Sequence, residues 1–170
     1  MAAGHAAGAT FVALDGAVEL LDLGIDRLGL PLAYRIGPAG YDIAHESFDD
    51  FTATLAGRGL RPLSPVHVRA ARVPGSGDIA ISWTRRTRIG GDTWATVDVP
   101  LGEDREAYRV EILDGETVRR TIETTVPSAV YASADELADF GTPLSSLSLR
   151  VSQLGAVIGA GIARKVTIDV

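Results

Sequence analysis

The chain has 170 residues, a net charge of −6 and no cysteine. Its length suits one domain, or one domain and part of another, and 46% hydrophobic with 22% charged residues indicates a folded, soluble protein rather than a disordered one. The acidic balance disfavours nucleic acid as a partner, because phosphate binding depends on Lys and Arg. The lack of cysteine excludes disulfides, thiolate metal sites and cysteine nucleophiles.

The chain begins with MAAGHAAGA, a run of mostly small residues that predicts a flexible lead-in over residues 1–9. No basic segment followed by a long apolar run is found there, so we predict no signal peptide. No apolar stretch approaches the roughly 18 residues that a membrane helix needs. We therefore expect no membrane insertion.

Residues 10–57 predict a smaller β-rich segment. Two segments that flank Gly16 have the pattern of strands, TFVALD and AVELLDL. The second segment also fits the start of a short helix that continues through GIDRLGL, so both interpretations stay open. Residues 32–37 and 51–57 alternate in hydrophobicity, as a strand does. Such strands without an evident core of their own indicate the tail end of a preceding domain.

An acidic, polar loop separates these two strands and contains Asp42, His45, Glu46, Asp49 and Asp50. Carboxylate oxygens are suitable ligands for a hard cation. Their spacing lacks the alternation of an EF-hand, so we interpret the segment as a solvated loop and predict no metal site. An acidic enzymatic site in this loop is kept as a rival hypothesis.

A Pro-containing connector follows at residues 58–65. Pro62 and Pro65 each restrict φ and push the preceding residue toward extended geometry. The pattern predicts a semi-rigid link to the rest of the chain.

Residues 66–170 predict a β-sandwich, because short alternating segments are separated by turn signals. The expected strands are residues 66–73, 78–84 and 94–99, two arms of a hairpin within 105–126, a strand around Val130 and Tyr131, and residues 147–154 and 165–170. The expected inward-facing residues are Val66, Val68, Ile79, Ile81, Trp83, Tyr108, Val110, Ile112, Leu147, Leu149, Val151, Val166, Ile168 and Val170. A polar loop is expected after Tyr131.

The hairpin is the clearest of these elements. Apolar residues alternate with charged ones up to the turn at Asp114-Gly115. Val118 and Ile122 on the return strand are an even number of residues apart, so we expect both on the buried face.

The most distinctive local sequence is TRRTRIGGDTW, in which Arg85, Arg86 and Arg88 precede a turn and Trp94 follows it. A hairpin tip of this kind presents guanidinium groups beside an indole, and Arg and Trp are enriched at binding hot spots. We predict these four residues as a partner-binding surface.

The alternative is structural: Trp94 packs on the sandwich, and the arginines pair with Asp92, Asp98 and Glu111. The glycine-rich segments 75–78 and 155–163 lack the strand–loop–helix context of a phosphate loop. No nucleophile, base and orienting acid are marked by the sequence. We therefore predict no catalytic residue, no cofactor and no enzymatic activity.

Several segments carry a family resemblance in combination: TFVALDGAVELLDLGIDRLGLPLAYRIGPAG, GRGLRPLSPVHVRA, ISWTRRTRIGGDTW, PLGEDREAYRVEILDG and LSLRVSQLGAVIGAG. Together they resemble the C-terminal region of the large tail-tip protein of gene transfer agents, which are phage-like particles. This is the host-specificity, glycoside-hydrolase TIM-barrel-like baseplate protein. The resemblance spans residues 11–170.

The resemblance implies an all-β fold, in which a fibronectin type III-like β-sandwich follows the smaller β-rich segment. It implies a non-enzymatic structural or adhesion module in the tail of a virion-like particle, made in the cytoplasm and part of a homo-oligomeric tail-tip assembly. The implied partners are other tail or baseplate subunits or the host-cell surface, contacted by loops 75–78, 87–94 and 155–161. The family's TIM-barrel-like domain lies upstream of this region, so no hydrolase activity is carried over to these residues.

Two alternative functions remain. One is a carbohydrate-binding accessory module. The other is a fragment of a cell-wall-degrading tail enzyme that lacks its catalytic domain.

Overall fold

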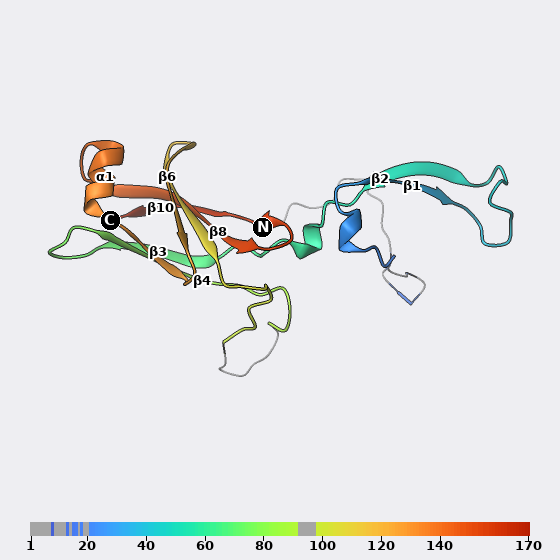
Figure 1. The fold of residues 1–170 in the computed structure, drawn as a ribbon, viewed down its shortest axis with the longest axis horizontal. Coiled ribbons are helices and arrows are strands. Elements are labelled where there is room, and N and C mark those ends of the chain that lie inside the picture. Colours follow the sequence, from blue (N-terminus) through green and yellow to red (C-terminus); the bar gives the residue numbers. More distant parts are fainter. Residues whose placement is uncertain (1–7, 9–12, 14, 17, 19–20, 92–97) are drawn as a thin grey trace. The chain divides into compact units, whose positions relative to one another are not determined.

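The structure is a computed structural model that describes residues 8, 13, 15, 16, 18, 21–91 and 98–170 (Figure 1). The chain forms two compact units, residues 1–56 and 57–170. Most of the predicted lead-in and of the TFVALD strand lies outside the described residues. Of the segment for which strand and helix were both open, residues 18 and 21–30 are described: they form no strand, and a 3-10 helix covers Ile25–Arg27. No helix in the described part of the chain is long and apolar enough to cross a membrane.

The first unit contains an antiparallel hairpin. A 3-10 turn, η1 (Ile25–Arg27), precedes β1 (Pro31–Ile36), and β2 (Asp49–Thr54) returns along it. The two strands expected here are confirmed, but β2 begins two residues earlier than expected and ends at Thr54. Asp49 and Asp50 are therefore strand residues and do not belong to the acidic loop.

The second unit is a sandwich of two antiparallel sheets. One sheet has the spatial order β3 (Val66–Arg72), β4 (Ile79–Thr84), β7 (Ser128–Tyr131). The other has the order β10 (Arg164–Asp169), β8 (Ser146–Gly155), β5 (Tyr108–Asp114), β6 (Thr117–Thr124), and the short β9 (Gly159–Ala160) pairs with β8. This distribution of strands is that of a fibronectin type III domain, so the predicted all-β, fibronectin type III-like fold is confirmed.

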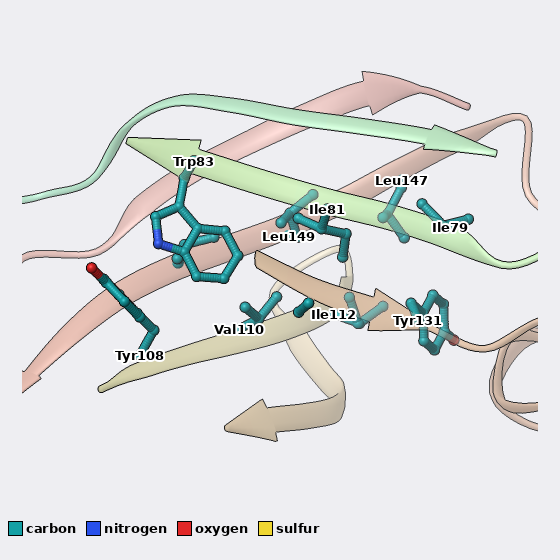
Figure 2. Close-up of a cluster of buried hydrophobic side chains, with 11 residues drawn as sticks. Ile79, Ile81, Trp83, Tyr108, Val110, Ile112, Tyr131, Leu147 and Leu149 are labelled. Atoms are coloured by element: carbon teal, nitrogen blue, oxygen red, sulfur yellow. The ribbon is translucent and has the colours of Figure 1, made fainter. Parts of the chain in front are cut away.

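The core lies between the two sheets (Figure 2). Alternate residues of β4, β5, β7 and β8 point into it because side chains of a strand alternate between its faces. Its buried members are Ile79, Ile81, Trp83, Tyr108, Val110, Ile112, Ala129, Tyr131, Leu147, Leu149 and Val151. The half-buried residues packed against it include Val68, Ile122, Val166, Ile168 and Val170. The predicted inward faces are therefore confirmed except at Val66. Val66 lies opposite the exposed Thr84 and is not among the residues packed against the core, because the register of β3 on β4 shifts between Val66 and Arg69.

A β-bulge in β6 changes the expected hairpin face. Val110 lies opposite Ile122, but Val118 lies opposite Leu113, because the register shifts by one residue between them. Ile122 packs against the core, whereas Val118 is exposed. The expectation that both residues share the buried face was wrong. Residues an even number of positions apart lie on the same face only where the strand has no bulge between them.

The predicted polar loop after β7 is a helix instead, α1 (Ser133–Phe140). Acidic residues, among them Glu136, lie in its first turn, where the helix dipole favours negative charge. Gly141 ends it with φ 76°, in the left-handed region. The backbone N–H of Ser133 donates to Asp78 Oδ1 at 2.9 Å, so a carboxylate from the β3–β4 turn satisfies a free donor at the helix start.

The segment expected as a connector, residues 58–65, is packed within the second unit. It begins with a 3-10 turn, η2 (Arg58–Leu60), and both Pro62 and Pro65 are buried. The backbone N–H of Ile162 donates to the carbonyl of Pro62 at 3.1 Å. The chain after residue 57 is thus part of the sandwich rather than a link to it.

The strand expected at residues 94–99 falls mainly on residues outside the described part of the chain. Its last two residues, Asp98 and Val99, are described and belong to no strand.

Candidate functional site

The predicted contact residues lie on the long loop between β4 and β5. Arg85, which follows β4, is mostly buried, with its side chain 14% exposed. Its guanidinium donates to Asp98 Oδ2 at 2.5 Å and to the carbonyl of Val99 at 2.7 Å. Arg85 therefore joins the outgoing and returning arms of the loop.

Arg88 forms a second internal anchor. Its Nη2 donates to Glu103 Oε1 at 2.9 Å, and the Glu103 side chain is only 9% exposed. The same guanidinium donates to the carbonyls of Gly102 at 3.2 Å and Gly59 at 3.0 Å. Arg88 therefore fixes the loop both to its own returning arm and to η2.

Two exposed side chains lie on the outgoing arm of the loop, Arg86 between the two anchors and Ile89 directly after Arg88. Arg86 is exposed, and no described residue forms a hydrogen bond or ion pair with it. Ile89 is 62% exposed. The Thr87 hydroxyl donates to the carbonyl of Ile89 at 2.9 Å, which closes a local turn. The outgoing arm thus presents a guanidinium and an apolar side chain on an anchored backbone.

The structural alternative holds in part. Arg85 pairs with Asp98 as that alternative expects, whereas Glu111 pairs with Arg150 at 2.6 Å. Trp94 and Asp92 lie outside the described residues. Partner binding by Arg85, Arg86, Arg88 and Trp94 stays a prediction.

The base of the loop is a layer of buried polar side chains. Trp83 and Tyr108, at its two roots, make an edge-to-face contact with ring centroids 5.2 Å apart (Figure 2). Burial, together with the hydrogen bond from its hydroxyl to Glu106, raises the pKa of Tyr108 far above its ordinary value. Gln153, which pairs with Tyr108 across the sheet, is 1% exposed. Its amide and the Trp83 indole N–H have no hydrogen-bond partner among the described residues.

Two other loops expected to face partners are held to the sandwich by hydrogen bonds, and each keeps exposed residues, among them Ser76 and Val157, so their contact with partners stays a prediction. In the β3–β4 turn, the carbonyl of Gly77 accepts from Arg72 at 2.8 Å, and the carbonyl of Ser76 accepts from Ser133 at 3.1 Å. In the segment 155–161, the backbone N–H of Gly161 donates to the carbonyl of Gln153 at 2.8 Å. An added Cβ at Gly161 would lie 2.5 Å from the carbonyl oxygen of Pro62, so only glycine fits there.

The acidic segment of the first unit does not converge on a common point. Asp42 accepts from the backbone N–H of Ala44 at 2.9 Å, and His45 Nδ1 lies 2.9 Å from the Ser47 hydroxyl. Across the described residues, no group of three or more His, Asp or Glu side chains is arranged to hold a metal ion.

No protein-family model matches the sequence, and a search of curated proteins finds no match. Among solved structures, the rat CD45 extracellular region, domains d3–d4, matches with a TM-score of 0.46 and 12% identity, over 100% of this chain and 80% of that chain. FN3tt mut matches with a TM-score of 0.43 and 11% identity, over 64% of this chain and 96% of that chain. The glycoside hydrolase domain of Endo-D from Streptococcus pneumoniae R6 matches with a TM-score of 0.42 and 13% identity, over 72% of this chain and 17% of that chain. Similarity of this extent says nothing about function.

Proposed function

We propose that this chain is a non-enzymatic structural or adhesion module of a phage-like tail tip. In this proposal it binds a neighbouring baseplate subunit or the host-cell surface through the β4–β5 loop. The observation that carries the proposal is the anchoring of this loop by Arg85 and Arg88, with Arg86 and Ile89 exposed on its outgoing arm. The sequence resemblance to gene transfer agent tail-tip proteins supports the biological setting.

An anchored loop favours binding for a thermodynamic reason. Association loses affinity whenever a loop has to be ordered on contact, and a loop already held by ion pairs avoids much of that loss. The guanidinium of Arg86 can bind a carboxylate with paired hydrogen bonds, while Ile89, three residues further along the same arm, supplies apolar contact area. The arm therefore suits a partner surface that offers both a carboxylate and an apolar pocket.

The test uses phage-like particles that incorporate the chain, with Arg86→Ala and Ile89→Ala combined. We expect fewer complete tails or weaker attachment to recipient cells, with an unchanged melting temperature of the purified chain. The matched control is Arg69→Ala, because Arg69 is also an exposed arginine of the sandwich but lies on β3. Full assembly and attachment by the double variant would overturn the loop assignment.

The tail-tip setting itself is tested by the unsubstituted chain. We expect it to be found in purified particles and to bind tail subunits. Its absence from every particle, or saturable binding to a glycan array in place of tail subunits, would overturn the proposal in favour of a carbohydrate-binding module.

A further inference from the structure

The β1–β2 hairpin of the first unit has two chemically different faces. On one face Tyr34 lies opposite Phe51, and their rings stack with centroids 5.1 Å apart. Leu32, Ile36 and Ala53 share that face by the alternation of the strands. We call this set of five residues the apolar hairpin face.

The opposite face is polar and carries an ion pair. Arg35 Nη1 lies 3.5 Å from Asp50 Oδ2, and Ala33 pairs with Thr52 beside it. The alternation is therefore that of a strand pair with one face toward water and the other toward apolar contacts.

The described residues of the first unit leave the apolar hairpin face partly exposed. No described residue of 1–56 is buried. Ile36 is 55% exposed and Phe51 45% exposed, and in the loop that joins the strands Tyr41 and Ile43 are 57% and 63% exposed. A two-stranded hairpin is at best marginally stable alone in water. Contiguous apolar surface of this kind marks an interaction site.

The charge of this unit indicates what covers the face. Residues 1–56 contain eight Asp or Glu and two Arg, and so carry the whole net charge of −6, whereas residues 57–170 contain fourteen residues of each sign. Three of the acidic residues border the apolar hairpin face at its loop end: Asp42 and Glu46 in the loop, and Asp49 in β2 opposite Ile36. Asp50 lies on the polar face and pairs with Arg35. A second copy of the chain would bring two such acidic borders together, which costs electrostatic free energy.

We propose that the apolar hairpin face is a docking surface for a protein partner that presents an apolar patch bordered by Lys and Arg. The apolar contact supplies most of the affinity, and the opposite charges of the two borders fix orientation and speed association. This surface is separate from the β4–β5 loop, and the inference does not depend on the function proposed above.

The test uses the full chain and a synthetic amphipathic peptide of Leu and Lys, with two matched peptides, one of Leu and Glu and one of Ser and Lys. Binding is followed by fluorescence anisotropy. We expect the Leu/Lys peptide to bind at least about tenfold more tightly than either matched peptide, because the face requires both apolar contact and positive charge. Equal binding of Leu/Lys and Leu/Glu peptides, or no binding of either, would overturn the proposal.

Variants locate the contact. Phe51→Ser combined with Tyr34→Ser should weaken binding of the Leu/Lys peptide at least about tenfold, since both rings lie on the face. Thr52→Ser combined with Ala33→Ser is the matched control on the polar face and should bind as the unsubstituted chain does. Equal loss in both double variants would place the contact elsewhere and overturn the proposal.

Amide hydrogen exchange on the unsubstituted chain locates the contact without requiring that the variants fold. Addition of the Leu/Lys peptide should slow exchange in β1 and β2 and leave β5 and β8 unchanged. Protection confined to the second unit would contradict the assignment. A stable dimer of the free chain that Phe51→Ser dissociates would also overturn it, because the occupant would then be a second copy.

Discussion

Arg72 of β3 and Glu136 of α1 form a two-point salt bridge, with Nη1 and Nη2 of the arginine each 2.9 Å from a different carboxylate oxygen. The backbone N–H of Leu144 donates to the same carboxylate at 2.7 Å, and Glu136 is 1% exposed. Arg72 also donates to the carbonyls of Gly77 and Leu144. One ion pair therefore joins β3, the β3–β4 turn, α1 and the start of β8 at one end of the sandwich.

Replacement of Glu136 by Ala should lower the free energy of unfolding by about 2–3 kcal/mol. This lies between the loss of an exposed pair and that of a fully buried one, because the Arg72 side chain remains 28% exposed and can be partly hydrated. Chemical denaturation followed by Trp fluorescence measures the change.

The matched control for that variant is Glu123→Ala. Glu123 also pairs with an arginine, Arg109, at 2.9 Å, but its side chain is 59% exposed. Its loss should change the free energy of unfolding by about 0–1 kcal/mol. Equal effects of the two substitutions would show that the α1 pair contributes no more than a surface pair.

Acid should destabilise the second unit through the same helix. The hydrogen bonds from Arg72 lower the pKa of Glu136, and those from Arg120 lower the pKa of Asp139. Because these carboxyls bind protons more weakly when folded, their stabilisation is complete above the ordinary Glu pKa of 4.5 and is lost as the pH falls below it. Denaturation midpoints measured from neutral pH down to about pH 3 should therefore fall less steeply for Glu136→Ala. An unchanged slope in that variant would contradict the assignment.

Gln153→Met should stabilise the protein. The Gln153 amide is buried and has no hydrogen-bond partner among the described residues, so an apolar side chain of similar size removes a desolvation cost of about 1–3 kcal/mol. Thermal and chemical unfolding measure the gain. Leu149→Met, at a purely apolar core position, is the matched control and should cost less than about 1.5 kcal/mol. A loss of stability in Gln153→Met would indicate that the amide is satisfied, for instance by internal water.

Arg88 and Arg86 should differ in their effect on stability although both lie on one loop. Arg88→Ala leaves the mostly buried Glu103 carboxylate without its partner, so we expect the free energy of unfolding to fall by about 1–3 kcal/mol. Arg86→Ala should leave the melting temperature unchanged, because no described residue pairs with Arg86. A lower melting temperature in Arg86→Ala would show that it is a structural residue like Arg88.

Alternation predicted the strands of the sandwich well. Every second residue of β4 is buried, as expected from a period of two: Ile79, Ile81 and Trp83. The same rule failed for Val118, because a bulge shifts the register without a clear signal in the sequence. The signals for α1 were present: acidic residues at its start and Gly141 at its end are typical helix boundaries. A polar composition led us to expect a loop there.

The candidate site was predicted less completely than the fold. The arginine-rich segment was recognised, but the sequence left open whether its guanidinium groups bind a partner or pair internally. Arg85 and Arg88 find acceptors 13 and 15 residues further along the chain, and Arg72 finds Glu136 across 64 residues. No local pattern indicates which carboxylate the fold will bring near.

The sequence by itself determined which side chains of the unbulged strand segments point into the sandwich, because the direction of a side chain there follows from the local geometry of a strand. Only the tertiary structure decided that Arg85 and Arg88 hold the β4–β5 loop, that Arg86 stays exposed, and that a short helix closes one end of the core through Glu136. The physical reason is that ion pairs and hydrogen bonds depend on distances between residues far apart in the chain, which are set only when the two sheets pack together.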